Sequence, residues 1–111
     1  MQINSEKKND ISIIRVSGNV DIQTSPDMKK YLDKEITGEN NKIVIDLKDV
    51  DYVDSSGLAT LVEVLKSLRA VSGKLKLTNL SPKVKGLFEI TKLNNLFDIY
   101  GDEEEALNSF E

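Results

Sequence analysis

The sequence predicts an α/β fold in which a mixed, mostly parallel sheet of four to five strands is covered by about four helices. Short apolar runs rich in β-branched residues, such as Ile-Val-Ile-Asp-Leu at 43–47, are typical of buried strands. Other segments repeat apolar residues at helical spacing, as at Leu58, Leu61 and Leu65. Because strands and helices alternate over most of the chain, parallel pairing through right-handed crossovers is expected.

Two strands are expected at the beginning of the chain. Residues 11–16, Ile-Ser-Ile-Ile-Arg-Val, are typical of a strand, and Gly18 marks its end. Ile3 and its neighbours predict a short edge strand that pairs with it. Because no helical segment separates the two, we expect one antiparallel edge on an otherwise parallel sheet.

The first helix is expected after a polar turn. Thr24-Ser25-Pro26 predicts its start, since a hydroxyl can cap a helix and proline fits an early helical position. Its buried face consists of apolar residues at helical spacing, namely Met28, Leu32 and Ile36. Gly38 is expected to end the helix, because glycine readily adopts the backbone conformation found there.

The strand at 43–47 is followed by a second helix, expected to continue to about Val71 and to stop at Ser72-Gly73. Alternation in Leu-Lys-Leu at 75–77 predicts the next strand. Ser81-Pro82 then repeats the capped helix start. The apolar face of this third helix comprises Val84, Leu87 and Phe88.

The end of the chain predicts one more strand and one more helix. Residues 97–100, Phe-Asp-Ile-Tyr, indicate a short strand. Asp102, with Glu105 three residues later, resembles a capping box and predicts a last helix to about Phe110. The glutamates at 103–105 are interpreted as a solvated helix start that complements the helix dipole, with no chemistry of their own.

Length and composition predict one soluble domain over residues 1–111. The chain has a mass of 12.4 kDa, with 39% hydrophobic and 31% charged residues. It contains no apolar stretch of membrane-spanning length, no secretory signal and no cysteine, so a cytoplasmic protein is expected. The net charge of −4 and scattered basic residues disfavour direct binding of nucleic acid. A protein partner is the better hypothesis.

Histidine is absent, and this excludes several kinds of site. Neither a Ser-His-Asp triad nor an imidazole metal site can be built from this chain. No Gly-rich phosphate loop is present either. We therefore expect no enzymatic activity, no metal and no cofactor.

Asp54-Ser55-Ser56-Gly57-Leu58 is the most informative motif. It lies between a predicted buried strand and an amphipathic helix, so it opens the helix. A hydroxyl there is well placed to carry a phosphate, because free N–H groups and the helix dipole favour negative charge. Simpler interpretations remain: Ser55 or Ser56 can cap the helix, Gly57 can serve a tight turn, and Asp54 can be an ordinary acid at a helix start.

A second motif, Gly18-Asn19-Val20-Asp21, follows the strand at 11–16. If that strand and the strand at 43–47 are parallel neighbours, their carboxyl ends share one edge of the sheet. Asp21 would then lie close to Ser55, in the crevice where open α/β sheets usually hold their sites. Taken alone, Asp21 is more often a turn residue.

Three segments together resemble the bacterial anti-sigma factor antagonists of the STAS family. They are the turn at 18–21, the strand and serine loop at 43–58, and the helix at 81–93 (Ser-Pro-Lys-Val-Lys-Gly-Leu-Phe-Glu-Ile-Thr-Lys-Leu). Their order and spacing match the family over nearly the whole length, which implies a single STAS domain. Ala59 stands where members often have a second glycine.

The resemblance implies a regulatory function through partner switching. The unphosphorylated protein would bind an anti-sigma factor that is also a serine kinase, and the sigma factor would be released. Phosphorylation of Ser55 would end that binding, and a phosphoserine phosphatase would restore it. The partner-binding residues implied by the match are Asp21, Asp54, Ser55, Ser56, Gly57 and Leu58.

Two other functions are compatible with parts of this sequence. The chain could be a structural STAS subunit of a transporter or signalling assembly, without any phosphorylation cycle. It could also be a phosphoaspartate receiver with Asp46 as acceptor, although the paired acids that a receiver needs after its first strand are missing.

Overall fold

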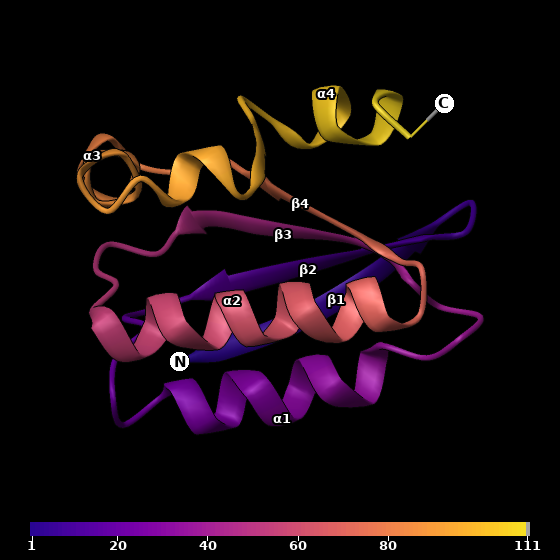
Figure 1. The fold of residues 1–111 in the computed structure, drawn as a ribbon, viewed down its shortest axis with the longest axis horizontal. Coiled ribbons are helices and arrows are strands. Elements are labelled where there is room, and N and C mark those ends of the chain that lie inside the picture. Colours follow the sequence, from indigo (N-terminus) through magenta and orange to yellow (C-terminus); the bar gives the residue numbers. More distant parts are fainter. Residues whose placement is uncertain (111) are drawn as a thin grey trace.

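A five-stranded sheet with strand order β1-β2-β3-β4-β5 forms the centre of the molecule (Figure 1). The computed structural model describes residues 1–110. The strands are β1 (Gln2–Lys8), β2 (Ile11–Ser17), β3 (Lys42–Asp49), β4 (Lys74–Thr78) and β5 (Asp98–Tyr100). β1 and β2 are antiparallel, and all other neighbours are parallel. The predicted mixed sheet with one antiparallel edge is confirmed, although β1 is a full seven-residue strand rather than a short one.

Helices cover both faces of the sheet (Figure 1). They are α1 (Ser25–Glu35), α2 (Ser55–Ala70), α3 (Pro82–Ile90) and α4 (Glu103–Asn108), with a 3₁₀ turn at Leu93–Asn95. α1 and α2 lie side by side on one face, α4 lies on the other, and α3 packs near the start of α2. No helix within residues 1–110 is long and apolar enough to span a bilayer.

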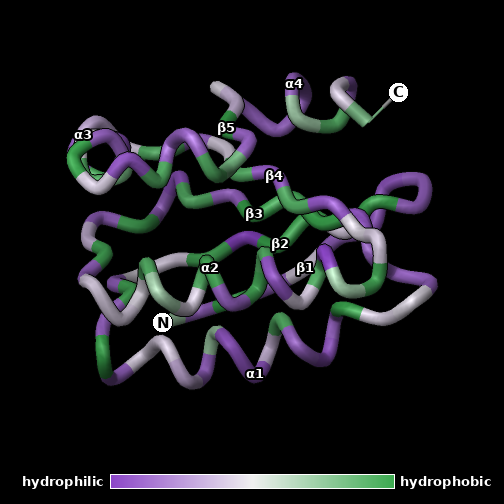
Figure 2. The backbone as a smooth tube through the Cα atoms, viewed as in Figure 1, coloured by the Kyte–Doolittle hydropathy of each residue, from purple (hydrophilic) through white to green (hydrophobic). Residues whose placement is uncertain are grey.

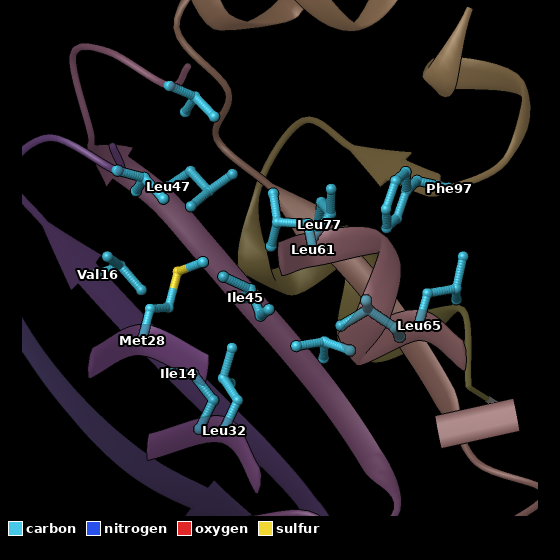
Figure 3. Close-up of a cluster of buried hydrophobic side chains, with 14 of the residues drawn as sticks. Ile14, Val16, Met28, Leu32, Ile45, Leu47, Leu61, Leu65, Leu77 and Phe97 are labelled. Carbon is cyan, nitrogen blue, oxygen red and sulfur yellow. The ribbon is translucent and has the colours of Figure 1, made fainter. Parts of the chain in front are cut away.

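The larger core lies between the sheet and helices α1 and α2. Figure 2 shows hydrophobic residues concentrated in the central strands and alternating with hydrophilic ones along α1. Alternate residues of β2 and β3 point to this side, where they meet Met28 and Leu32 of α1 and Leu61 of α2 (Figure 3). Side chains alternate between the two faces of a strand, so every second strand residue points into this core. A helix turns once in 3.6 residues, so every third or fourth helical residue does so.

The opposite face is covered more thinly, by α4 and the aromatic rings near it. Its small apolar cluster contains Ile11, Ile13, Val44 and Ala106. Arg15 of β2 makes a two-pronged ion pair with Glu103 of α4, with both N–O distances at 2.9 Å. The interpretation of the 103–105 run as merely solvated is therefore wrong for Glu103, because α4 docks on the sheet through this side chain.

Asp46 lies in β3 beside that ion pair and is only 6% exposed. Its carboxylate accepts hydrogen bonds from the Lys48 backbone N–H at 2.8 Å and from the Asn79 amide at 3.1 Å. Burial raises the pKa of Asp46 above its ordinary 3.8, and the adjacent Glu103 raises it further. A buried, hydrogen-bonded side chain within a strand is a poor acceptor for a phosphoryl group from another protein.

The start and end of α1 differ from the prediction. The Thr24 side chain does not cap the helix, because its hydroxyl donates to the Asn19 carbonyl oxygen at 2.7 Å and so holds the preceding loop. The helix ends at Glu35, before Gly38. The Asn40 amide donates to the Glu35 carbonyl oxygen at 2.6 Å, so a glycine is not needed to terminate the helix.

The later helix starts agree with the prediction. The Ser81 hydroxyl accepts from the Val84 backbone N–H at 3.3 Å. Asp102 accepts from the Glu105 N–H at 2.8 Å, and the Glu105 carboxylate accepts from the Gly101 N–H at 3.0 Å. These contacts form a variant of the capping box, with the return bond one residue earlier than usual.

Candidate phosphoacceptor site

The loops after β2 and β3 are joined by backbone hydrogen bonds beyond the ends of their strands. Val20 and Val53 form an isolated parallel bridge. The Val20 N–H donates to the Tyr52 carbonyl oxygen at 2.9 Å, and the Asp54 N–H donates to the Val20 carbonyl oxygen at 3.1 Å. The turn at 18–21 and the serine motif, which are far apart in sequence, therefore share one edge of the sheet.

Asp54 holds this arrangement together with both of its carboxylate oxygens. Oδ1 accepts from the Gly57 N–H at 3.0 Å and caps α2. Oδ2 accepts from the Ile22 N–H at 3.1 Å in the neighbouring loop. The cap of α2 is thus Asp54, and the interpretation of Ser55 and Ser56 as capping hydroxyls is wrong.

Ser55 is the first residue of α2 and is exposed. Its hydroxyl makes no hydrogen bond to another side chain or to the backbone within residues 1–110. Ser56 is partly buried, and its carbonyl oxygen accepts from the Thr60 hydroxyl at 3.0 Å. Of the two neighbouring hydroxyls, that of Ser55 is the more accessible to a second protein.

Gly57 is required by close packing of the two loops. A Cβ at this position would lie 2.7 Å from the Val20 carbonyl oxygen and 2.8 Å from methyl groups of both Val20 and Val53. Leu58 follows and is only 7% exposed, so its side chain belongs to the core. These two residues position the serine, and their side chains contribute little to the outer surface.

Asp21 organises its own turn. Its Oδ1 accepts from the backbone N–H groups of Gln23 and Thr24, at 3.0 and 3.1 Å. The next residue, Ile22, is 72% exposed although it is apolar, and its N–H is held by Asp54. Ile22 is not among the partner-binding residues predicted from the sequence. The one signal that points to it is a single large apolar residue in a polar turn, directly after Asp21.

A cavity of about 430 Å³ opens beside Ser55, between the β3–α2 connection and α3. Its lining includes apolar residues of both segments, with Asp51, Tyr52, Lys83 and Thr91 at its edges. The Lys83 ammonium lies 5.7 Å from the centre of the Tyr52 ring, within the range of a cation–π contact.

Within the described residues, 1–110, no three acidic, Cys or His side chains gather as a metal site would require.

Comparison with known proteins identifies the family. The family model for the STAS domain matches residues 2–106. This chain belongs to the STAS family. Among STAS relatives, the anti-sigma-B factor antagonist of Bacillus subtilis (strain 168) is 36% identical over 107 residues, covering 94% of this chain and 96% of the relative.

Solved STAS structures show the same fold. A candidate anti-sigma factor antagonist from Thermotoga maritima is 27% identical, with a TM-score of 0.91 over 96% of this chain and 92% of that one. The anti-sigma factor antagonist SpoIIAA in its unphosphorylated form is 22% identical, with a TM-score of 0.75 over 98% of this chain and 97% of its own. At this lower identity the likeness is one of fold.

Proposed function

We propose that this protein is an anti-sigma factor antagonist that works by partner switching, with Ser55 as the phosphoacceptor. In its unphosphorylated form it binds an anti-sigma factor that is also a serine kinase, and the sigma factor is released. The observation that carries the proposal is the exposed Ser55 hydroxyl at the first position of a helix fixed by Asp54. Its relatives, named as antagonists of anti-sigma factors, support the choice of partner.

The chain supplies the nucleophile and the kinase supplies the remaining groups. The Ser55 oxygen bonds to the γ-phosphorus of ATP while the bond from that phosphorus to the bridging oxygen breaks, and ADP leaves. The serine proton passes to a base on the kinase. The hydroxyl is accessible without rearrangement of this fold, because Ser55 is exposed and no hydrogen bond within residues 1–110 restrains its hydroxyl.

Phosphorylation changes charge more than shape. A phosphoserine adds about −1.5 to −2 charges at neutral pH. Free N–H groups and the dipole at the start of α2 accommodate that charge. Asp54 is adjacent in sequence and Asp51 lines the same cavity, so the surface becomes strongly acidic. To bind, the kinase would have to remove water from this phosphate and accommodate its bulk. A cost of about 2 kcal/mol, half the energy of a unit charge pair at about 4 Å and a dielectric of 20, weakens binding more than about tenfold.

Substitution of the two serines tests the proposal. Ser55→Ala should bind the kinase but incorporate no phosphate, and Ser55→Asp should lose binding with a native circular dichroism spectrum. Ser56→Ala is the matched control and should still be labelled. Intact-mass spectrometry and isothermal titration calorimetry provide the readouts. Labelling that disappears in Ser56→Ala and persists in Ser55→Ala would show that the acceptor is wrongly assigned.

A structural role in a larger assembly would give a different result. No serine kinase of the source organism would then label the protein, and it would copurify stably with membrane components.

A phosphatase specific for phosphoserine completes the proposed cycle and should return the labelled protein to its binding form.

A further inference from the structure

We propose that the cavity beside Ser55 receives an apolar side chain of the kinase, while a basic side chain of the same partner lies over Asp51 and Asp54. This inference rests on the proposed function and adds α3 to the contact surface. It names a second point of attachment, distinct from the hydroxyl that is phosphorylated.

The cavity has an apolar interior. Val53, Leu58 and Val84 line it and are each less than one-tenth exposed, and Leu87 of α3 adds a partly buried wall. Polar side chains lie around its mouth, where Asp51, Lys83 and Thr91 are exposed. An apolar side chain entering there would lose contact with water without stranding a buried polar group.

The position of Ser55 identifies the occupant. Ser55 lines the same cavity, so a kinase whose active site reaches that hydroxyl must also lie over the cavity mouth. Tyr52 stands at the rim with 44% of its surface exposed. Exposed tyrosines next to apolar pockets often contribute strongly to protein interfaces. The cavity is thus continuous with the surface that the kinase has to cover.

The charges of the residues that line the cavity indicate which kind of side chain the kinase places over them. Asp51 and Asp54 belong to the cavity lining, and the only basic residue in that lining is Lys83, which lies near the face of the Tyr52 ring. A Lys or Arg of the kinase placed over the two carboxylates would be attracted to them. A phosphoryl group on Ser55 would stand at the cavity mouth and hinder the apolar contact sterically.

A pair of tryptophan substitutions on α3 and its end tests the apolar contact. Thr91 lines the cavity, whereas Glu89 is exposed on the same helix but lines a different cavity, with Leu80 and Phe97. Thr91→Trp should fill the cavity and raise the Kd for the kinase at least tenfold. Glu89→Trp, the matched control, should change it less than twofold. The kinase used is the one from the source organism that labels the wild-type protein.

Charge reversals test the basic contact with variants that leave the core untouched. Asp51→Lys should raise the Kd at least tenfold at low salt and less at high salt. Glu39→Lys makes the same change in net charge in the exposed loop before β3, at the opposite end of the sheet, and should have little effect. Circular dichroism confirms that each variant is folded.

The labelling kinetics separate docking from chemistry. Thr91→Trp should raise KM with little change in kcat, because the Ser55 hydroxyl is intact. If Thr91→Trp and Asp51→Lys bind as tightly as the wild type, the inference is wrong and the proposed function stands. The cavity would then belong to another occupant, such as a small molecule. If no kinase binds or labels the wild-type protein, the proposed function itself fails.

Discussion

The two faces of the sheet are built by different means. The face under α1 and α2 is dry, and its central residues, such as Ile14, Ile45 and Leu61, are at most 1% exposed. On the face under α4, corresponding strand positions are occupied by Arg15, Asp46 and Lys76. The first face, the dry face, relies on apolar packing alone. The second, the charged face, adds ion pairs, hydrogen bonds and aromatic contacts to the small apolar cluster around Ile13 and Val44.

The difference follows from the helices that cover each face. α1 and α2 have 11 and 16 residues and present continuous apolar stripes, whereas α4 has six residues and a single buried one, Ala106. A short cover cannot exclude water completely, so long charged side chains with apolar stems are tolerated beneath it. Ser55 begins the long helix of the dry face, so the candidate site stands on the element with the larger apolar contact to the sheet.

The largest expected effect is a cavity in the dry face. Leu61→Ala should lower the free energy of unfolding by about 2–5 kcal/mol, because the removed atoms leave a gap in a close-packed core. Urea unfolding at 0.05 and 1 M NaCl measures it. The loss should be the same at both salt concentrations. A loss that varies strongly with salt would show that this face also depends on charge.

Gly57→Ala should have the next largest effect, a loss of about 1–3 kcal/mol from overpacking. The added methyl would collide with the Val20 carbonyl oxygen, which belongs to the backbone and cannot rotate away. Gly86→Ala is the matched control, because its Cβ would meet nothing within 4 Å in the middle of α3. It should be neutral or stabilising by up to about 1 kcal/mol. Equal effects of the two variants would contradict the close-packing argument.

Most of the fold could be predicted from the sequence, and so could the meeting of the two functional loops. Periodicity gave the order of strands and helices, and parallel pairing of β2 with β3 brought the turn at 18–21 to the serine motif. The interpretation in which Ser55 or Ser56 caps α2 is wrong, because Asp and Ser are equally good caps and a helix boundary read from sequence is uncertain by a residue.

Other features depend on contacts between distant segments. Arg15 and Glu103 are 88 residues apart, and nothing in a run of three glutamates shows which one is drawn onto the sheet. The bond that fixes the backbone of the exposed Ile22 likewise joins its N–H to Asp54, 32 residues away. Local patterns do not contain such information, since it arises only when tertiary packing brings the partners together.

Asp46→Asn should test the charged face through its pH dependence. Arg15 lowers the pKa of Glu103 to about 2 from 4.5, so this group stabilises the fold above about pH 4.5 and the stabilisation disappears as the pH falls toward 2. Burial raises the pKa of Asp46 above 3.8, so its stabilising effect is present when it is protonated and is lost as the pH rises through its folded-state pKa.

An asparagine at position 46 cannot ionise. Its oxygen can keep the bond from the Lys48 N–H, and its NH2 group can donate to Asn79 once that amide turns its oxygen toward it. Asp46→Asn should therefore stabilise the protein at pH 7, relative to wild type, by about 0.5–1.5 kcal/mol, and should lose that advantage in acid. Thermal unfolding from pH 3 to 8 measures the difference. An advantage that is constant with pH would contradict the role assigned to the Asp46 charge.

Lys76→Met should have the smallest effect. Lys76 is 6% exposed, and its ammonium lies 5.1 and 4.8 Å from the ring centres of Tyr100 and Phe110 and 4.0 Å from a largely exposed Asp98 carboxylate. Methionine keeps the length and the apolar stem while removing the charge. Because the cation–π attraction and the cost of desolvating the ammonium oppose each other, the net change should be within about 0.5 kcal/mol of zero.

Lys76→Ala is the informative comparison, because it removes the buried stem as well as the charge. If stem packing matters most, Lys76→Ala should be clearly less stable than Lys76→Met in urea unfolding at pH 7. If the two variants are equally destabilised, the ammonium itself stabilises this face. The charged face would then owe its stability to electrostatic contacts, and the contrast with the dry face would hold for energy as well as for composition.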